Sequence, residues 1–160
     1  MGYLSLKQRG LGYVLAQALF IGLILFGPQG FFLIPQSIVL WLPYLQGFGM
    51  GICILGLLLS LVAALNLGKN LTPLPCPKDD AQLVQVGLYH FVRHPIYSGV
   101  LLVALGWLLI HPYALVLLYV LALFIFFEFK TQREERWLLE KFPAYSEYRN
   151  RVKKLIPWVY

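Results

Sequence analysis

Charged residues are scarce in this chain: they make up 12% of its 160 residues, whereas 59% are hydrophobic. The mean hydropathy is accordingly high, at +0.71. A water-soluble fold of this composition would have to expose an apolar surface that water does not tolerate. The composition therefore predicts an integral membrane protein. Because each bilayer crossing takes roughly 20 residues, residues 1–160 are expected to form one domain, without a separate soluble one.

Cysteine is also scarce, with only two in the chain. Cys53 falls within an apolar run and Cys76 within a proline-rich loop. Because their environments differ in kind, the two thiols are not expected to form a disulfide or to share a metal ion.

Acidic residues are fewer than basic ones, and the net charge of +6 raises the question of a nucleic-acid partner. The thirteen Lys and Arg residues, however, lie almost entirely in the polar segments between and after the apolar runs. That distribution is typical of membrane topology signals and of contacts with anionic lipids. Membrane lipids are therefore the expected partners, and nucleic acid is not.

Long apolar runs, in contrast, dominate the chain. There are four of them: Leu11 to Phe26, Tyr44 to Leu67, Ile96 to Ile110 and Tyr113 to Phe129. Apart from Glu128, none contains Asp, Glu, Lys or Arg. They predict an all-α membrane protein with about four transmembrane helices. Residues 31–41 are apolar but interrupted by Pro35, which indicates an interfacial segment or, as the alternative, a partial helix.

Orientation follows from where the basic residues lie. They precede the first apolar run, separate the second from the third, and follow the fourth: Lys7, Arg9, Lys69, Lys78, Arg93 and the basic residues of the tail. The other two connections contain none. The positive-inside rule then predicts a multi-pass protein with both termini, the loop 68–95 and an amphipathic C-terminal helix on the cytoplasmic side.

A short connection, His111-Pro112, separates the third and fourth runs. Such a link requires a tight antiparallel hairpin. The hairpin brings residues 93–95 and residues 128–136 to the same membrane face. The chain is thus divided into N-terminal helices, residues 1–67, and a loop, hairpin and tail, residues 68–160.

Functional side-chain types are densest between Gly87 and Gly99. A purely structural interpretation is open, with Arg93 reaching lipid phosphates, Pro95 beginning a helix and Tyr97 joining an interfacial aromatic belt. His90 and His94 are four residues apart, a spacing that suits a metal ion. No metal site is expected, because Phe91 stands where a zinc protease would need Glu and because Pro95 interrupts the helix.

Two further polar segments follow the last apolar run. Residues 130–136 fit either a solvated amphipathic helix or one wall of a pocket shared with Arg93 and His94. In the tail, Tyr145, Tyr148 and Val152 share one helical face, which can close over that pocket or rest on lipid.

Arg93-His94-Pro95-Ile96-Tyr97, followed after one apolar hairpin by Glu134-Glu135, resembles the signature of the isoprenylcysteine carboxyl methyltransferase and phospholipid methyltransferase group. The resemblance extends from about Asn66 to Pro157. It implies S-adenosylmethionine as the cofactor. The residues that it assigns to the cofactor are Ala81, Gln82, Leu83, Val84, Tyr89, Arg93, His94, Pro95, Ile96, Tyr97 and Glu134.

Those residue types suit the implied cofactor. A methyl sulfonium with an adenosine needs aromatic faces, a carboxylate for ribose hydroxyls or an ammonium group, and a histidine or arginine for its own carboxylate. The sequence lacks the glycine-rich turn after a strand that a soluble, doubly wound methyltransferase would offer.

The chain departs from the family where the acceptor is bound. The carboxyl methyltransferases have a substrate-carboxylate arginine one helical turn before the cofactor glutamate, and here that position is Lys130, with Arg133 as a competing candidate. Lys130, Arg133 and Glu134 are therefore the expected catalytic residues. A second departure is Pro143, which replaces a glycine usual in the family and affects local backbone geometry.

The resemblance implies methyl transfer to a lipophilic acceptor, an isoprenylcysteine-like carboxylate, a prenylated substrate or another hydrophobic small molecule. Two enzymatic alternatives stay open, beside a non-catalytic role in membrane assembly or transport. Membrane sterol reductases share a similar arginine-histidine-proline-x-tyrosine element and a tail like residues 156–160, but use a nicotinamide phosphate cofactor; phospholipid N-methylation is the other.

Overall fold

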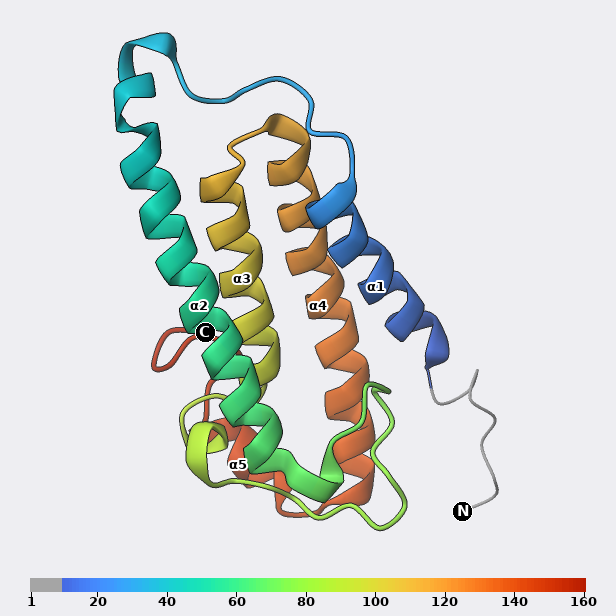
Figure 1. Cartoon of the computed structure of the whole chain (residues 1–160). Coiled ribbons are helices and arrows are strands. Elements are labelled where there is room, and N and C mark those ends of the chain that lie inside the picture. Colours follow the sequence, from blue (N-terminus) through green and yellow to red (C-terminus); the bar gives the residue numbers. More distant parts are fainter. Residues whose placement is uncertain (1–9) are drawn as a thin grey trace.

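The computed structural model describes residues 10–160, apart from the side chains of residues 37 and 38. Within this range it is helical, without extended strands, so the predicted all-α fold is confirmed (Figure 1). The helices are α1 (Leu11–Phe26), α2 (Leu42–Leu67), α3 (Pro95–Ile110), α4 (Ala114–Lys141) and α5 (Tyr145–Arg151), with short 3-10 helices η1 (Gln36–Trp41), η2 (Gly68–Asn70) and η3 (Gly87–His90).

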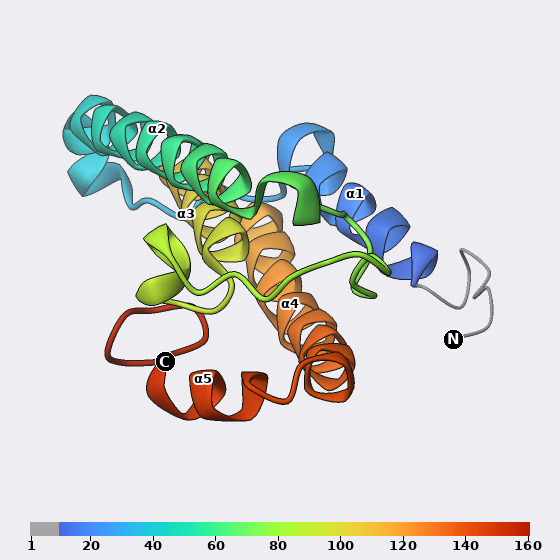
Figure 2. The same cartoon turned by 90° about the horizontal axis from the view of Figure 1, so that it is seen from below.

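The four longer helices lie side by side in one bundle, with α2 against α3 and α1 against α4 (Figure 1). The loop 68–94, α5 and the tail gather at one end of this bundle (Figure 2). The predicted hairpin is confirmed, since residues 111–113 join the antiparallel α3 and α4 at the other end. A buried cluster of Ile24, Ala104, Val120, Leu123 and Phe127 ties α1, α3 and α4 together.

Two of the helices, α2 and α4, are long and apolar enough to cross a membrane, and α1 and α3 are shorter apolar helices. Large apolar side chains face outward along α2, among them Phe48, Leu57, Leu61 and Leu65. An outward apolar face of this kind suits contact with lipid rather than with water.

The helix boundaries follow from local breakers. The predicted first helix is confirmed at both ends, where Gly10 adopts a positive φ and Gly27 precedes Pro28. The third begins at Pro95, whose missing N–H costs nothing in a first turn.

The fourth apolar run ends at Phe129, and α4 continues without a break through the charged residues to Lys141, so the expected helical conformation of residues 130–136 is confirmed. Between Phe129 and Pro143 there is no glycine or proline, so the change from apolar to charged residues does not end the helix. At 28 residues, α4 is about 42 Å long and exceeds the roughly 30 Å hydrocarbon core of a bilayer. A helix of this length that crossed a bilayer would extend beyond that core.

Residues 31–41 run across the end of the bundle that holds the α3–α4 turn. Leu33 donates its amide to the carbonyl of Pro112 at 2.8 Å, and the Phe32 ring packs edge-on against Tyr113. Only the second half of the segment is helical, as η1.

The contact between α2 and α3 is made by small residues. A Cβ added to Gly56 would lie 2.6 Å from the carbonyl oxygen of Gly99, and one added to Gly106 would lie 2.6 Å from the carbonyl oxygen of Gly49. The Cys53 thiol sits in the same seam, 3.4 Å from the carbonyl oxygen of Val103. The two backbones therefore approach as closely as glycine allows.

Candidate active site

A buried carboxylate, Glu135 on α4, connects α4 to the start of α3 and to α5. Its Oε1 lies 2.9 Å from Arg93 Nε and 3.1 Å from His94 Nε2, and its Oε2 lies 3.3 Å from Arg149 Nε. Because the Arg93 side chain is also nearly buried, this carboxylate balances a positive charge that water scarcely reaches, and it is hydrogen-bonded to His94 as well.

The tail completes the hydrogen bonds of the residues before α3. The amides of Arg93 and His94 donate to the carbonyls of Lys153 and Lys154 at 2.8 and 3.0 Å. The Ser98 hydroxyl donates to the carbonyl of Leu155 at 2.7 Å. These bonds pair the two residues that precede α3 with the tail, and they hold the signature residues in place.

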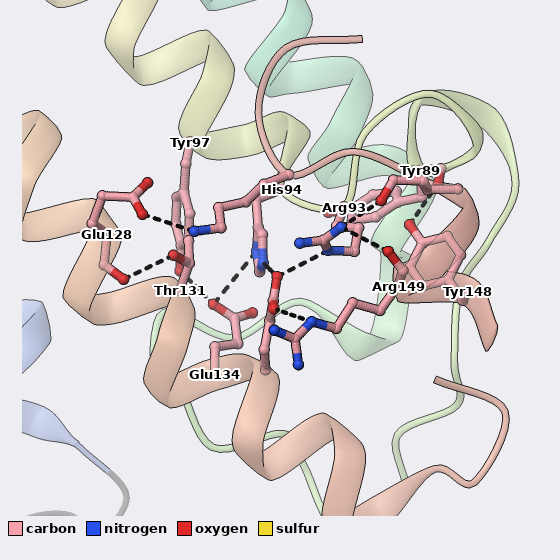
Figure 3. Close-up of polar contacts among 12 residues, drawn as sticks. Tyr89, Arg93, His94, Tyr97, Glu128, Thr131, Glu134, Tyr148 and Arg149 are labelled. Atoms are coloured by element: carbon pink, nitrogen blue, oxygen red, sulfur yellow. Dashed lines mark hydrogen bonds and ion pairs between the residues drawn. The ribbon is translucent and has the colours of Figure 1, made fainter. Parts of the chain in front are cut away.

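Next to this junction, Tyr97 and Glu134 form a second contact between α3 and α4. The Tyr97 hydroxyl donates to Glu134 Oε2 at 2.8 Å. The Tyr97 ring stacks between His94, at 5.5 Å between centroids, and Phe127, at 4.7 Å. The predicted meeting of the two signature halves at one end of the hairpin is thus found in the structure (Figure 3).

A cavity of about 490 Å³ lies beside these contacts, within the usual range for sites that hold small molecules or cofactors. It is bounded by α1, the loop 68–94, the start of α3, the last turns of α4 and α5. Sequence-predicted residues that line it are Ala81, Gln82, Leu83, Val84, Tyr89, Arg93, His94, Ile96, Tyr97, Lys130 and Glu134.

The structure does not bring two other predicted residues into the cavity. Pro95 is buried at the start of α3 and has no part in the lining. Arg133 is exposed on another face of α4, where its guanidinium lies 5.2 Å from the Trp137 ring. Around the helix axis, residue 134 lies about 40° to one side of residue 130 and residue 133 about 60° to the other side. Residues 133 and 134 are thus about 100° apart, and only residue 134 faces the cavity.

Lys130 lies deep in the cavity wall, with only 2% of its surface exposed. Its Nζ donates to Gln17 Oε1 on α1 at 2.5 Å and lies 5.1 Å from the Tyr97 ring centroid. Aromatic contact of this kind stabilises a buried ammonium group.

The wall contributed by residues 81–86 is an extended segment held by two asparagines. Asn70 Oδ1 accepts from the Gln82 amide and Asn66 Oδ1 from the Leu88 amide, both at 2.9 Å. Gly87 adopts a φ of +62°, and any Cβ there would collide with Asn66. Within the described part of the chain, the amides of Leu83 and Val84 donate to no other group, so they are available to a ligand.

The tail face of Tyr145 and Tyr148 covers the cavity rather than resting on lipid. Both rings line it and are almost fully buried. The Tyr148 hydroxyl donates to the carbonyl of Tyr89 at 2.6 Å, and burial raises its pKa to about 12. Burial, followed by the nearby charge of Glu134, raises the pKa of Tyr89 as well. These phenols therefore stay protonated and can donate hydrogen bonds at neutral pH.

Sequence reasoning missed several residues of the site. Glu135 was identified only as one of the two adjacent glutamates of the signature, although it makes the ion pairs that join α4 to Arg93 and Arg149. Gln17 and the loop residues 71–77 were not singled out. Gln17 had a signal, since it is the sole amide or charged side chain in the first apolar run, whereas the proline-rich loop had none.

Comparison with known proteins assigns this architecture to a family. A family model described as phospholipid methyltransferase matches residues 45–145, which is more than half of the chain and includes both halves of the signature. The chain belongs to this family. The phospholipid methyltransferase match therefore covers most of the cavity wall but not α1.

Similar members of the family are protein-S-isoprenylcysteine O-methyltransferases. The chain is 39% identical to that of Saccharomyces cerevisiae over 85 residues, which cover 51% of this chain and 35% of the yeast protein. It is 36% identical to that of Tribolium castaneum over 121 residues, covering 72% and 43%. The solved structure of a eukaryotic intramembrane Ras methyltransferase, an isoprenylcysteine carboxyl methyltransferase, matches with a TM-score of 0.67 at 28% identity, over 93% of this chain and 52% of that one. The chain thus spans about half the length of these relatives, or less.

Proposed function

We propose that this protein transfers a methyl group from S-adenosylmethionine to the carboxylate of a lipophilic acceptor of the isoprenylcysteine type. The observation that carries the proposal is the cavity that joins Glu134, Tyr97 and the free amides of residues 83–84 on one side to the buried Lys130 on the other. The names of the similar proteins support the same reaction.

The residues present fit the cofactor. Glu134 offers carboxylate oxygens to ribose hydroxyls or to an ammonium group, and the amides of Leu83 and Val84 offer donors to the edge of an adenine ring. The aromatic ring of Tyr89, which lines the cavity, suits the positive sulfur. When bound, S-adenosylmethionine supplies an electrophilic methyl group, so that transfer forms an oxygen–carbon bond and breaks a sulfur–carbon bond.

The chain's own contribution is alignment and shielding. Lys130 attracts the acceptor carboxylate, which needs no base because it is already ionised. Glu134 and the loop 81–84 fix the donor, and the buried rings of Tyr145 and Tyr148 keep water from one side of the cavity. Holding two reactants in line in this way accounts for much of the rate of a displacement. Arg133 is not part of the proposal because it lies outside the cavity.

The test separates the two ends of the cavity. Glu134→Gln should weaken S-adenosylhomocysteine binding by roughly tenfold to a hundredfold, because it removes a charge-assisted hydrogen bond of about 1.5–3 kcal/mol. Lys130→Ala should leave that affinity nearly unchanged and depress turnover of an N-acetylated S-prenylcysteine. Calorimetry in detergent and a methyl-transfer assay measure the two effects.

The matched control is Arg133→Ala, a basic residue on the same helix outside the cavity, for which parent-like binding and turnover are expected. NADPH serves as the competing ligand. If NADPH stabilises the protein and S-adenosylhomocysteine does not, the methyltransferase proposal is wrong and a lipid reductase takes its place.

We further propose a multi-pass arrangement in which α1 to α4 all cross the membrane, with both termini and the loop 68–95 in the cytoplasm. Lys7 and Arg9, on which the sequence prediction partly rests, lie outside the described residues. The loop 68–94 and the tail lie at one end of the bundle (Figure 2). They contain most of the basic residues of the chain, which supports the proposal because basic residues favour the cytoplasmic side.

Labelling of single cysteines tests this orientation. In a background without Cys53 and Cys76, cysteine at the exposed position Asp80 should react with an impermeant maleimide only after the cells are opened. Cysteine at the exposed position Gln29, at the other end of the bundle, should react in intact cells. The reverse pattern would place the cavity on the outer face and refute the proposed orientation.

A further inference from the structure

The amide side chain of Gln17 is unusual for its helix, α1, which is otherwise apolar. Every other side chain of α1 lacks an amide or a charge, and Gln17 lies in the middle of that helix. An amide within an apolar membrane helix is costly unless it is paired or performs a function. Gln17 lines the cavity together with Val14, Ala18 and Ile21, which lie on the same face of α1.

The contact with Lys130 determines how the Gln17 amide is oriented. An ammonium group has only donors, so the atom 2.5 Å from Lys130 Nζ is the amide oxygen. The amide nitrogen, Nε2, is therefore directed elsewhere. Within the described part of the chain it has no acceptor, so its two N–H donors are available to a molecule in the cavity.

Lys130 itself lacks a bonded anion. Among the described residues, no carboxylate lies within ion-pair distance of its Nζ, although the side chain is almost fully buried. A buried ammonium that is bonded only to a neutral amide retains most of its attraction for an incoming carboxylate.

A lysine alone holds a carboxylate loosely. An arginine presents a planar fork whose two N–H groups match both carboxylate oxygens, whereas a lysine is a point charge that fixes one contact. Transfer from oxygen to a methyl group requires a defined direction of approach, so the second carboxylate oxygen needs a donor too. Gln17 Nε2 belongs to the same amide group whose oxygen bonds Lys130. It is therefore close to the expected position of the second carboxylate oxygen of the acceptor.

We infer that Gln17 is an acceptor-binding residue, which with Lys130 forms a two-donor site for the acceptor carboxylate. The ammonium bonds one oxygen and the Gln17 amide bonds the other. This inference rests on the proposed function and deepens it: it predicts that the enzyme selects acceptors with a free carboxylate and disfavours esters and amides of the same lipid.

The experiment compares Gln17→Leu with the parent in detergent or lipid nanodiscs, using an N-acetylated S-prenylcysteine as acceptor. The KM for the acceptor should rise about tenfold, because one hydrogen bond to a charged group is lost, while S-adenosylhomocysteine affinity stays unchanged. Gln17→Glu should be more severe, since its carboxylate would occupy Lys130 in place of the acceptor.

A rescue variant excludes a merely structural role for Gln17. Lys130→Arg in the Gln17→Leu background supplies both donors from one guanidinium and should restore the parent KM to within about threefold. If Gln17 served only to tie α1 to α4, this rescue would not occur, because leucine still removes the tie. The matched control is Gln46→Leu, which removes an amide that bonds the carbonyl of Ile110 at the far end of α2 and should leave the KM unchanged.

The outcomes are distinct. If the parent neither binds S-adenosylhomocysteine nor methylates the acceptor, the proposed function fails and this inference fails with it. If the parent methylates the acceptor but Gln17→Leu keeps the parent KM, or if Lys130→Arg does not restore it, the assignment of Gln17 is overturned and the proposed function stands.

Discussion

Replacing Glu135 by alanine is expected to lower the free energy of unfolding by about 3–5 kcal/mol and the melting temperature by on the order of 10 °C. The reason is that Glu135 is the shared anion of Arg93, His94 and Arg149. Without it, the Arg93 guanidinium stays buried against main-chain carbonyls with its charge unbalanced. Thermal unfolding in detergent, followed by loss of S-adenosylhomocysteine binding, measures the effect.

Glu140→Ala is the matched control, because Glu140 lies on the same helix and is exposed. It should change the melting temperature by less than about 2 °C. Equal melting temperatures for the Glu135 and Glu140 variants would contradict the role given to the buried junction. The Glu135→Gln variant adds information, since it keeps the shape and a hydrogen-bonding oxygen but removes the charge.

The second large effect is expected from the glycine seam. Gly56→Leu should cost about 3 kcal/mol or more, because the added side chain meets the backbone of α3 at Gly99 and Val103, at 2.6 and 2.8 Å for the Cβ alone. Backbone atoms cannot move aside as a flexible side chain does, so α2 and α3 must separate. Thermal unfolding of detergent-purified protein is the measurement.

Gly51 provides the control within the same helix. A Cβ at Gly51 meets nothing within 4 Å, so Gly51→Leu should fold and bind S-adenosylhomocysteine like the parent. Gly56→Ala should fall between the two, since it adds one carbon at the same contact. If Gly56→Leu is as stable as Gly51→Leu, the close approach of α2 and α3 does not contribute to stability.

Hydropathy and local breakers were enough to predict the helices. Gly10 and Gly27 bound the first helix, and Pro95 begins the third, so these limits were readable from residue type alone. In α4 the apolar residues end at Phe129, whereas the helix continues to Lys141. Polarity reports the solvent around a helix, whereas glycine, proline and capping decide where it ends.

For the site, the sequence predicted the residues at the two open ends of the α3–α4 hairpin. It did not predict the residue that α1 contributes, Gln17. Arg93, Tyr97 and Glu134 were foreseeable together, because a tight hairpin must place its two open ends at one level. Gln17 meets Lys130 across 113 residues of sequence, and no periodic pattern encodes a contact of that range. Such contacts depend on how α1 packs against α4, which composition does not specify.

The pairing of the residues before α3 with the tail has a consequence for biosynthesis. Arg93 bonds the carbonyls of Arg149 and Val152, and its amide bonds Lys153, partners that are translated 56 to 60 residues later. A nascent chain that has already synthesised α3 and α4 therefore still lacks the segment that closes the cavity. The cavity is then completed only after the helices α1 to α4 have been synthesised.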